Sequence, residues 1–524
     1  MSGSSVLNLA SILFNSVLEY SHEPALLSDG ESVSYGQLES RCRRFATLLR
    51  TTGIGVGDRV AIMAPNIPQF TVAYFGILSV GGIVVPLNVL LTGEEVASIL
   101  TGSGSTGLVL WEGVVEAGLE GFARAEPCRR LFTIGSSRFR AIDGSLDFDA
   151  SIETSAESLD VEDTKPNDTA VIFYTSGTTG RPKGAEITHF NLYSNARWVS
   201  EETIQSSGVK EFWGPGHVVL AALPFSHSFG QTCLQNASLF HGAAISLLPR
   251  FSAELAVRKI QEDRITLAAA VPSMIVSLLD YARSHKEVTS MLRYCLVGGA
   301  PISEGSVEAF EKEFDVKILV GYGLSETSPV IASCTVGSPG KPGSVGKPIS
   351  GVKVRIIDDH EMELPRGTPG EIVVLGDPVM KGYFRDPETT SAVIRAGWFH
   401  TGDIGYLDAE DHLFIIDRKK DTILRNGYSV YPREVEDVLI THPAVKESAV
   451  IGILDAACGE EVVAVVVMSP ETMATAEELI AHCKNRLAAY KFPRKIAFQE
   501  TLPKGTKGQV LKRVLRESLP LNLN

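Results

Sequence analysis

Short apolar runs alternate with longer amphipathic stretches through the first half of the chain, from about Leu26 to Ile275. The runs have the length of buried strands, and they include Arg59–Met63, Gly81–Pro86 and Gly107–Trp111. Between them, Tyr35–Arg50 and Thr92–Leu100 show helical spacing, and Glu95 follows Thr92 at the distance of a capping box. Strands that alternate with helices in this way predict an α/β fold, with parallel sheets covered by helices on both faces.

The pattern changes after Gly337, where glycine and proline become frequent. Short strands at Val352–Ile357 and Gly370–Leu375 predict a small β subdomain. A compact α+β unit is predicted beyond Asp417. Its expected elements are helices near Pro432–Thr441 and Thr475–Tyr490 and strands near Glu447–Leu454 and Glu461–Met468. We therefore place a domain boundary at Asp417–Lys420.

Three other segments could be a domain connection, a membrane span or a signal peptide. The acidic, serine-rich segment Phe148–Asp168 is weakly periodic and is predicted to be a surface connection. The apolar run Ile265–Leu279 contains Pro272 and is too short to span a bilayer. The residues from Ser5 onward begin like an amphipathic helix and lack the basic residues of a signal peptide. Without a membrane span or leader, we expect a cytoplasmic protein.

Composition and charge narrow the class of partner. The 524 residues are 44% hydrophobic and 21% charged, which is typical of a globular chain and excludes a disordered one. The net charge of −14 argues against binding to nucleic acid through its phosphates. A small anion can still be held by a helix terminus and one lysine. The seven cysteines are scattered and form no C-x-x-C motif, which argues against a disulfide framework or zinc site.

The segment Tyr174–Gly184 carries the clearest candidate chemistry. It follows the strand-like run Ala170–Phe173 and combines glycines and hydroxyl residues with one lysine. Its candidate phosphate contacts are Thr175, Ser176, Gly177, Thr178, Thr179 and Lys183. Backbone N–H groups, hydroxyls and a cation can surround phosphate oxygens in such a loop, although the spacing is not that of a Walker A motif. The alternative is a surface loop without a ligand.

A second glycine-rich string is a decoy. Gly102–Gly107 matches the pattern G-x-G-x-x-G of dinucleotide-binding proteins. That fingerprint must follow a strand and open a helix. Here the order is reversed, because the string follows the helix-like Glu94–Leu100 and precedes the strand-like Leu108–Trp111. We therefore expect an ordinary loop.

Five further motifs follow the phosphate-loop candidate in order. They are Leu223–Gly230, Gly298–Pro301, Gly321–Pro329, Trp398–Asp403 and Asp417–Asp421. With the loop, they resemble the adenylate-forming superfamily of acyl- and aryl-CoA synthetases, peptide-synthetase adenylation domains and luciferases over almost the whole chain. The resemblance implies an N-terminal AMP-binding domain, residues 1–417, of two doubly wound parallel-sheet subdomains and a small β subdomain. A smaller, mobile α+β domain, residues 418–524, would follow.

The resemblance assigns roles around a nucleotide. Tyr322 would stack on adenine, Ser325 and Thr327 would donate to the α-phosphate, and Glu326 would hold Mg²⁺. Asp403 would accept both ribose hydroxyls of ATP or AMP. The remaining implied nucleotide contacts are Arg418, Gly299, Ala300, Pro301, Gly321 and Gly323.

The same resemblance makes His227 a gate of the acyl pocket. The pocket would be lined near His227–Gln235, Val297–Pro301 and Tyr322–Val330. Each candidate also has a plainer interpretation. Tyr322 and His227 could be ordinary buried side chains, Glu326 a solvated acid at a helix start, and Asp403 a turn residue after Gly402.

Enzymes of this kind join a carboxylic acid to coenzyme A in two steps. The acid first reacts with Mg·ATP to give acyl-AMP, and after rotation of the C-terminal domain the thiol of coenzyme A displaces AMP. The hinge of that rotation corresponds to Lys420. Segment Arg425–Glu436 matches the family pattern that lines the pantetheine tunnel, with Arg425, Gly427 and Tyr428 as candidate coenzyme A contacts.

One residue departs from the family pattern near the C-terminus. The family expects L-P-x-x-x-x-G-K-x-L-K-R, and this chain has Gln509 at the position of the first lysine. That lysine contacts the carboxylate and the α-phosphate during adenylation. Losing one preorganised donor at such a transition state typically lowers the rate about 10²–10³-fold. Because acyl-AMP is already activated, the sequence predicts impaired adenylation and preserved thioesterification.

Three accounts of Gln509 stay open at this point. The first is a non-adenylating ligase, similar to the divided ligases of platensimycin and platencin biosynthesis, which accepts acyl-AMP from a separate adenylating enzyme. The second is a complete ligase in which Lys507 substitutes, and the third is an engineered Lys-to-Gln variant. From another class, the chain could be a non-catalytic protein that binds acyl-AMP. The intact hinge and tunnel segments argue against such a binder, and nothing specifies a light-emitting oxygenase.

Overall fold

The computed structural model describes residues 6–135, 142, 144–157, 160–175, 182–203, 213–285, 291–426, 428–455, 458–470, 472–505 and 510–518. The chain forms two compact units. The first comprises Met1–Lys353 and Val374–Phe399, and the second comprises Val354–Val373 and His400–Asn524. The predicted boundary at Asp417–Lys420 falls inside the second unit and stays a prediction.

A first sheet has parallel strands at its centre. Its order is β16 (Lys347–Pro348), β15 (Val330–Ser333), β14 (Lys317–Gly323), β13 (Tyr294–Val297), β12 (Leu267–Ala270), β10 (Val218–Ala221), β11 (Ala244–Leu247), β1 (Pro24–Ser28) and β2 (Glu31–Ser34). Neighbouring strands from β14 to β1 run parallel. The edge strands β2, β15 and β16 pair antiparallel.

A second sheet repeats this arrangement. Its order is β19 (Gly382–Tyr383), β9 (Lys183–Thr188), β8 (Thr169–Thr175), β4 (Ile83–Pro86), β3 (Arg59–Met63), β5 (Gly107–Trp111), β6 (Arg130–Ile134) and β7 (Leu146–Asp147). Strands β8 to β7 run parallel, whereas β9 and β19 are antiparallel additions at one edge. The two parallel sheets confirm the predicted α/β class.

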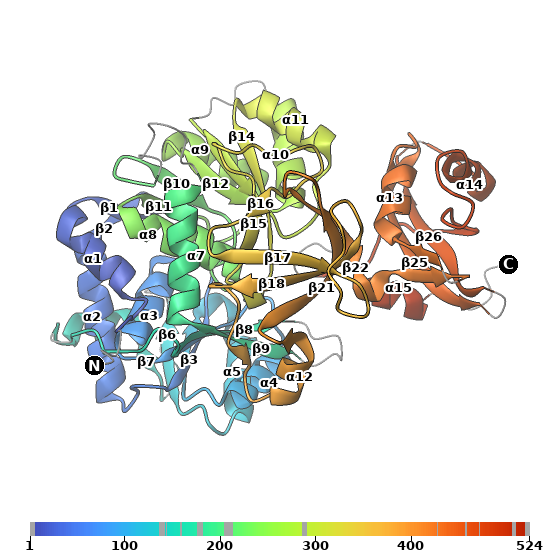
Figure 1. The fold of residues 1–524 in the computed structure, drawn as a ribbon. Coiled ribbons are helices and arrows are strands. Elements are labelled where there is room, and N and C mark those ends of the chain that lie inside the picture. Colours follow the sequence, from blue (N-terminus) through green and yellow to red (C-terminus); the bar gives the residue numbers. More distant parts are fainter. Residues whose placement is uncertain are drawn as a thin grey trace. The chain divides into compact units, whose positions relative to one another are not determined.

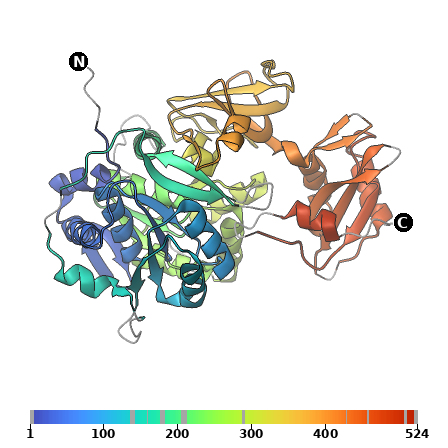
Figure 2. The same ribbon diagram turned by 90° about the horizontal axis from the view of Figure 1, so that it is seen from below.

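Helices cover both faces of the two sheets. The main ones are α2 (Tyr35–Thr51), α3 (Pro68–Ser79), α4 (Gly93–Ser103), α5 (Val115–Arg124), α7 (His189–Glu202), α9 (Ala253–Glu262), α10 (Pro272–Ser284) and α11 (Glu304–Phe314). Side chains alternate along the strands: Val219 faces a core shared by both sheets and Leu220 an outer core with α9, α10 and α11. In the second sheet, Val60 faces the shared core and Ala61 an outer core with α4 and α5. Figures 1 and 2 show the helices lying against the sheets.

A third sheet and a fourth sheet follow. The third has the order β17 (Val352–Ile357), β18 (Gly370–Gly376), β21 (Trp398–Leu407) and β20 (Ile394–Arg395), with β22 (Leu413–Arg418) beside β21. The fourth has the order β24 (Tyr428–Val430), β23 (Ile423–Arg425), β26 (Gly459–Met468) and β25 (Val445–Asp455), with β27 (Lys495–Phe498) beside β26. Helices α13 (Pro432–Ile440), α14 (Ala476–Lys484) and α15 (Lys512–Ser518) pack against the fourth sheet. These sheets match the predicted small β subdomain and α+β unit.

The remaining short elements complete the described chain. They are α1 (Ser11–Tyr20), the 3₁₀ turn η1 (Glu112–Val114), α6 (Phe148–Thr154), the π-helix η2 (Phe229–Asn236), α8 (Ala237–His241), the 3₁₀ turns η3 (Ser325–Thr327) and η4 (Lys419–Asp421), and α12 (Pro387–Val393). The predicted capping box of α4 is present, since Thr92 accepts from the Glu95 N–H and the Glu95 carboxylate accepts from the Thr92 N–H. The string Gly102–Gly107 joins α4 to β5, as predicted for a decoy.

The prediction that Phe148–Asp168 is only a surface connection is wrong at its start. Helix α6 occupies Phe148–Thr154, with the Asp147 side chain accepting from the Ala150 N–H at 2.8 Å. The Phe148 ring is fully buried, 4.6 Å from the Phe45 ring centre. A helix of two turns has too few buried positions to produce visible periodicity. Two other helices differ in their ends, because α1 begins at Ser11 and α14 stops at Lys484.

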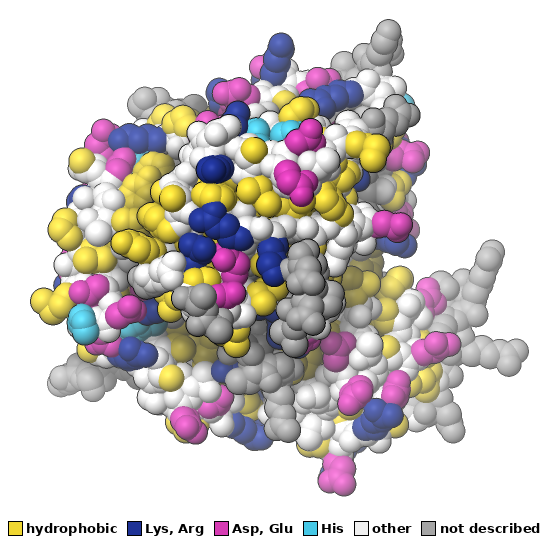
Figure 3. Space-filling view, turned by 90° about the vertical axis from the view of Figure 1, so that its right-hand side faces the viewer, with side chains coloured by type: hydrophobic (Ala, Val, Ile, Leu, Met, Phe, Trp, Pro, Cys, Tyr) yellow, Lys and Arg dark blue, Asp and Glu magenta, His cyan; other side chains and the backbone are white. Residues whose placement is uncertain are grey.

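The apolar run Ile265–Leu279 divides into β12 and the start of α10 at Pro272. No helix in the described part of the chain is both long enough and apolar enough to cross a bilayer. Figure 3 shows acidic and basic side chains interspersed with hydrophobic ones on one face of the molecule.

A buried histidine fastens the start of the described chain to the first unit. The His189 ring lies at the beginning of α7 and is 1% exposed. Its Nδ1 accepts from the Leu9 N–H at 3.0 Å, so this nitrogen carries no proton. Burial lowers the pKa of His189 to about 4. An unfolded histidine titrates near pH 6.5. Between pH 4 and 6.5, His189 is therefore mostly neutral in the folded protein and mostly protonated in the unfolded chain.

We expect His189 to make the first unit less stable as pH falls from about 6.5 to 4. In this window the unfolded chain binds a proton that the folded chain excludes, so the loss reaches about 2 kcal/mol at pH 5. The urea midpoint at pH 7.5 and pH 5 measures it. His189→Asn keeps an acceptor without titrating and should reduce this pH dependence, whereas His360→Asn, at an exposed site, should not. Equal pH dependence in all three proteins would contradict the assignment.

Candidate active site

The carboxyl ends of β13 and β14 bring two of the predicted motifs together. These strands are parallel and pair Val297 with Val320, so Gly298 and Gly321 follow side by side. A Cβ on Gly298 would lie 3.1 Å from the Gly321 carbonyl oxygen and 3.5 Å from the Phe229 ring. The close approach therefore favours glycine, because a larger residue would require its neighbours to shift. The predicted contacts Gly299, Ala300 and Pro301 continue from this edge, with Gly299 in a left-handed conformation at φ +81°.

Residues 321–329 form a tight loop at the end of β14. Gly323 is needed there, since a Cβ would lie 1.8 Å from the Pro329 carbonyl oxygen. The fully buried Thr327 hydroxyl accepts from the Leu324 N–H at 3.0 Å and donates to the Pro329 carbonyl at 2.6 Å. This hydroxyl thus stabilises the loop itself, and a contact from Thr327 to phosphate stays a prediction.

Glu326 lies within this loop and is 9% exposed, so the interpretation as a solvated acid does not hold. Its Oε1 accepts from the Tyr383 hydroxyl at 3.0 Å and from the Thr175 hydroxyl at 3.3 Å. Within the described residues, no lysine or arginine forms an ion pair with it. A buried carboxylate held only by neutral donors suits a hard cation such as Mg²⁺, which prefers carboxylate oxygen.

Tyr383 links Glu326 to the phosphate-loop candidate. Burial, reinforced by the Glu326 charge, raises the pKa of Tyr383 well above its ordinary value, so its hydroxyl stays a donor. Lys183 Nζ lies 5.6 Å from the centre of the Tyr383 ring, within the range of a cation–π contact. Strands β8 and β9 pair Thr175 with Lys183, so the two ends of the loop meet. The predicted contacts Ser176, Gly177, Thr178 and Thr179 lie outside the described residues.

The candidate gate residue lies near this group. His227 precedes Ser228, whose hydroxyl is 3.5 Å from the Ser325 hydroxyl. The structure therefore brings the Leu223–Gly230 motif beside the loop that holds Ser325 and Glu326. Tyr322 is partly buried on β14, and its contact with adenine stays a prediction.

The second unit carries the predicted ribose contact. Asp403 on β21 and Arg418 on β22 are register partners, and Arg418 Nε lies 2.7 Å from Asp403 Oδ1. Asp403 is 3% exposed, lies within a strand and is therefore not a turn residue. Its ion pair to Arg418 fixes the orientation of the carboxylate.

Ion pairs lie on both sides of the predicted hinge. Lys419 Nζ contacts Glu371 at 2.9 Å and Asp359 at 3.0 Å. Two residues later, Asp421 pairs with Arg516 at 3.0 Å. Lys420 lies between them and is exposed, and no described residue forms an ion pair with it.

The candidate coenzyme A contacts differ in their surroundings. Arg425 forms two hydrogen bonds to Glu461, at 2.7 and 3.2 Å, and both side chains are mostly buried. Burial alone would raise the pKa of Glu461, but hydrogen bonds from Arg425 and the Val462 N–H hold it below its ordinary value. Tyr428 is exposed and stacks on Tyr490 with ring centres 4.7 Å apart. Gly427 lies outside the described residues.

Gln509 and Lys507 also lie outside the described residues, but the flanks of their segment are defined. Lys504 and Val510 form an antiparallel bridge. Lys504 pairs with Glu447 at 2.7 Å, and Lys512 pairs with the partly buried Glu436 at 2.8 Å. The described lysines on both sides of Gln509 are therefore committed to carboxylates.

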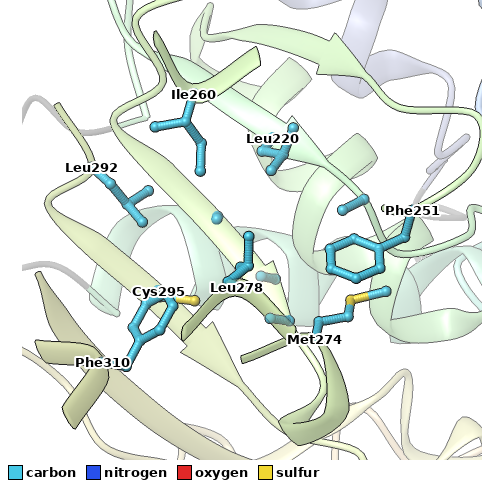
Figure 4. Close-up of a pocket in the computed structure, with 12 residues that line it drawn as sticks. Leu220, Phe251, Ile260, Met274, Leu278, Leu292, Cys295 and Phe310 are labelled. Atoms are coloured by element: carbon cyan, nitrogen blue, oxygen red, sulfur yellow. The ribbon is translucent and has the colours of Figure 1, made fainter. Parts of the chain in front are cut away.

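An apolar cavity of about 10 Å³ lies between the first sheet and α9, α10 and α11 (Figure 4). Phe251 and Met274 lie on one side of it and Cys295 and Phe310 on the other. Its volume is at the lower limit for one water molecule, and an apolar lining offers water no partner. None of its lining residues belongs to the predicted acyl-pocket segments, so it is a packing gap in the outer core.

Two side chains of the site were missed by sequence reasoning. Tyr383 reaches Glu326 because β19 pairs with β9, and Glu461 reaches Arg425 across the fourth sheet. Neither lies in a motif that the sequence analysis singled out. Only the pairing of strands far apart along the chain would have revealed them.

We expect the Arg425–Glu461 pair to stabilise the fourth sheet. Arg425→Met and Glu461→Gln should each lower the free energy of local opening of β26 by about 1–3 kcal/mol, because each leaves a partly buried partner unpaired. Hydrogen exchange of β26 amides measures this, and the double variant should lose little more than either single one. Arg433→Met removes a pair to Asp437, whose side chain is exposed, and serves as the control. Unchanged exchange in both single variants would indicate that Arg425 has no structural role.

The comparisons with known proteins agree with this geometry. Residues 13–384 match the family described as AMP-binding enzyme, and residues 434–509 match the AMP-binding enzyme C-terminal domain. The chain is 34% identical to a long-chain-fatty-acid–CoA ligase of Bacillus subtilis (strain 168), covering 97% of this chain and 94% of that protein. It is 32% identical to 4-coumarate–CoA ligase 2 of Oryza sativa subsp. japonica, covering 97% and 91%.

Among solved structures, ATP-bound MatB from Rhodopseudomonas palustris superimposes with a TM-score of 0.89 at 32% identity, covering 98% of this chain and 99% of that one. The sequence matches and the shared fold both extend over nearly the entire chain. The chain therefore belongs to the AMP-binding enzyme family, in the branch of the adenylate-forming superfamily that contains acyl-CoA ligases.

Proposed function

We propose that this protein catalyses thioesterification, the second half of the acyl-CoA ligase reaction. The coenzyme A sulfur bonds to the acyl carbon of acyl-AMP, the bond between that carbon and the phosphate oxygen breaks, AMP leaves, and the thiol proton passes to solvent. The observation that carries the proposal is Gln509, a neutral amide where related ligases place a lysine. A separate adenylating enzyme would supply the acyl-AMP.

The missing positive charge matters most in adenylation, the first step of the ligase reaction. There a carboxylate approaches a polyphosphate, and a cation aimed at the phosphorus stabilises the charge that develops. Glutamine can donate a hydrogen bond but carries no charge. The described neighbours Lys504 and Lys512 are held by Glu447 and Glu436 and would have to leave these pairs to substitute.

The first unit would hold the phosphate groups. We assign Lys183 and Ser325 to phosphate oxygens, and Glu326 to Mg²⁺, with Tyr383 and Thr175 orienting its carboxylate. When bound, Mg²⁺ would offset the negative charge of the phosphates. In the second unit, Asp403 would accept the ribose hydroxyls, and Arg418 holds that carboxylate in place.

The C-terminal part would supply the thiol channel. We propose rotation at Lys420 between residues 1–417 and 418–524, because the ion pairs of Lys419 and Asp421 fix its two sides. Gly427 and the exposed Tyr428 would line the path of coenzyme A. The names of the relatives include long-chain fatty acids and 4-coumarate, so we propose a bulky or hydrophobic carboxylic acid as the acyl group and a cytoplasmic location.

A second candidate is a complete ATP-dependent ligase in which Lys507 replaces the missing lysine. The observation that favours it is the position of Lys507, two residues before Gln509. A third, a binder of acyl-AMP without turnover, would form no thioester at all. The three candidates differ in which substrates they convert to acyl-CoA.

We expect the protein to convert acyl-AMP and coenzyme A to acyl-CoA, and to use the acid with ATP and coenzyme A far more slowly. Gln509→Lys should raise ATP–pyrophosphate exchange about 10²–10³-fold, because it restores the cation. Gln509→Met, equally long but uncharged, is the matched control and should not. The acyl-AMP substrates tested should include long-chain, aryl and short-chain acyl adenylates.

Other results would decide for another account. Equal rates of acyl-CoA formation from acyl-AMP and from acid plus ATP would contradict the non-adenylating proposal. If Lys507→Ala then abolished only the ATP-dependent rate, the complete ligase would stand. Acyl-AMP binding without any thioester would identify the binder.

Tyr383→Phe tests the assignment of Glu326. The substitution keeps the ring near Lys183 but removes the donor to the carboxylate. We expect the Mg²⁺ concentration for half-maximal ATP binding, measured by calorimetry, to rise about 10–100-fold, as is typical when a group that orients a metal ligand is lost. Tyr281→Phe, on helix α10 and outside the site, is the control and should leave it unchanged. The same Mg²⁺ requirement in both variants would remove Tyr383 from the site.

A further inference from the structure

A contact between the two sheets reaches the candidate gate residue. Asn88 lies two residues after β4, in the connection to α4, and His227 lies just before η2. Asn88 Nδ2 is 3.1 Å from His227 Nε2, and both side chains are partly buried. No motif identified from the sequence contains Asn88.

The orientation of the Asn88 amide follows from its second contact. The Leu90 N–H lies 2.9 Å from Asn88 Oδ1. A backbone N–H is only a donor, so the atom that faces it must be the amide oxygen. The NH₂ group of Asn88 therefore faces the histidine, and His227 Nε2 must accept.

For a neutral imidazole, this contact also indicates which nitrogen carries the proton. A neutral histidine has one donor and one acceptor nitrogen, so a ring that accepts through Nε2 carries its proton on Nδ1. A proton on Nε2 would place two donors opposite each other. Asn88 could accept from such a proton only by turning its amide, which would break the hydrogen bond from the Leu90 N–H.

The backbone around His227 is fixed on both sides. Its N–H donates to the Pro224 carbonyl at 3.1 Å, and its carbonyl accepts from the Gln231 N–H at 2.9 Å. Movement of the gate would therefore be rotation of the ring, and that rotation must break the contact with Asn88. The next residue, Ser228, lies beside Ser325, which is one of the candidate phosphate-binding residues.

We propose that Asn88 is a positioning residue for His227. It holds the ring in one orientation and in the Nδ1–H tautomer, and releases it when the gate moves. The consequence for the acyl-AMP step rests on the proposed function, whereas the tautomer does not.

The tautomer is tested on the full chain with ¹⁵N-labelled histidine, by long-range ¹H–¹⁵N correlation spectra. His227 is assigned by its loss in His227→Asn, and the other histidines serve as internal controls. We expect Nδ1–H in the wild type. Asn88→Asp has nearly the same shape but only accepts, so it should move the proton to Nε2. An Nε2–H wild type, or no change in Asn88→Asp, would overturn the proposal; a melting curve checks that the variant is folded.

Kinetics with acyl-AMP and coenzyme A test the role. Asn88→Asp and Asn88→Leu should raise KM for acyl-AMP about tenfold while KM for coenzyme A stays unchanged. Leu90→Ala, which keeps the backbone N–H and alters an exposed side chain, is the matched control. Equal KM values in all variants would refute the positioning role. If the wild type forms no thioester, the proposed function fails, and the spectra alone decide on Asn88.

Discussion

The carboxylate of Glu326 is buried, and within the described chain only the hydroxyl groups of Tyr383 and Thr175 donate hydrogen bonds to it. Removing an ion from water is unfavourable by several kcal/mol unless another charge or good hydrogen bonds compensate. The loop after β14, the edge strand β19 and the end of β8 are therefore arranged around one charge. Lys183 is kept near the same tyrosine but outside ion-pair distance, so the carboxylate remains available to a cation.

The strands and long helices could be predicted because their buried positions are periodic. Strands β3 and β5 have the predicted bounds, and α2 extends the predicted helix by one residue. Thr92 and Glu95 form their capping box because that contact is local in the sequence. Helix α6 was missed because Phe148 is buried by an aromatic contact to Phe45, a residue about a hundred positions away. Such long-range packing leaves no periodic trace.

The candidate site shows the same division between local and distant contacts. Motifs that are continuous in sequence, such as the one containing Glu326, were found as candidates. Tyr383, Glu461 and Asn88 each act on a candidate through a strand or loop that is far away along the chain. Arg425 is likewise engaged by a partner outside the motifs, Glu461. The Thr327 hydroxyl, by contrast, bonds to the Pro329 carbonyl within its own motif.

The register of β1 has a consequence for biosynthesis. Leu26 pairs with Ile245, so the first described strand takes its place beside a strand made about 220 residues later. Until then its apolar face and one hydrogen-bonding edge have no partner in this sheet, and such edges favour aggregation. During synthesis, the edge of β1 that will pair with β11 therefore stays without its partner strand until β11 has been made.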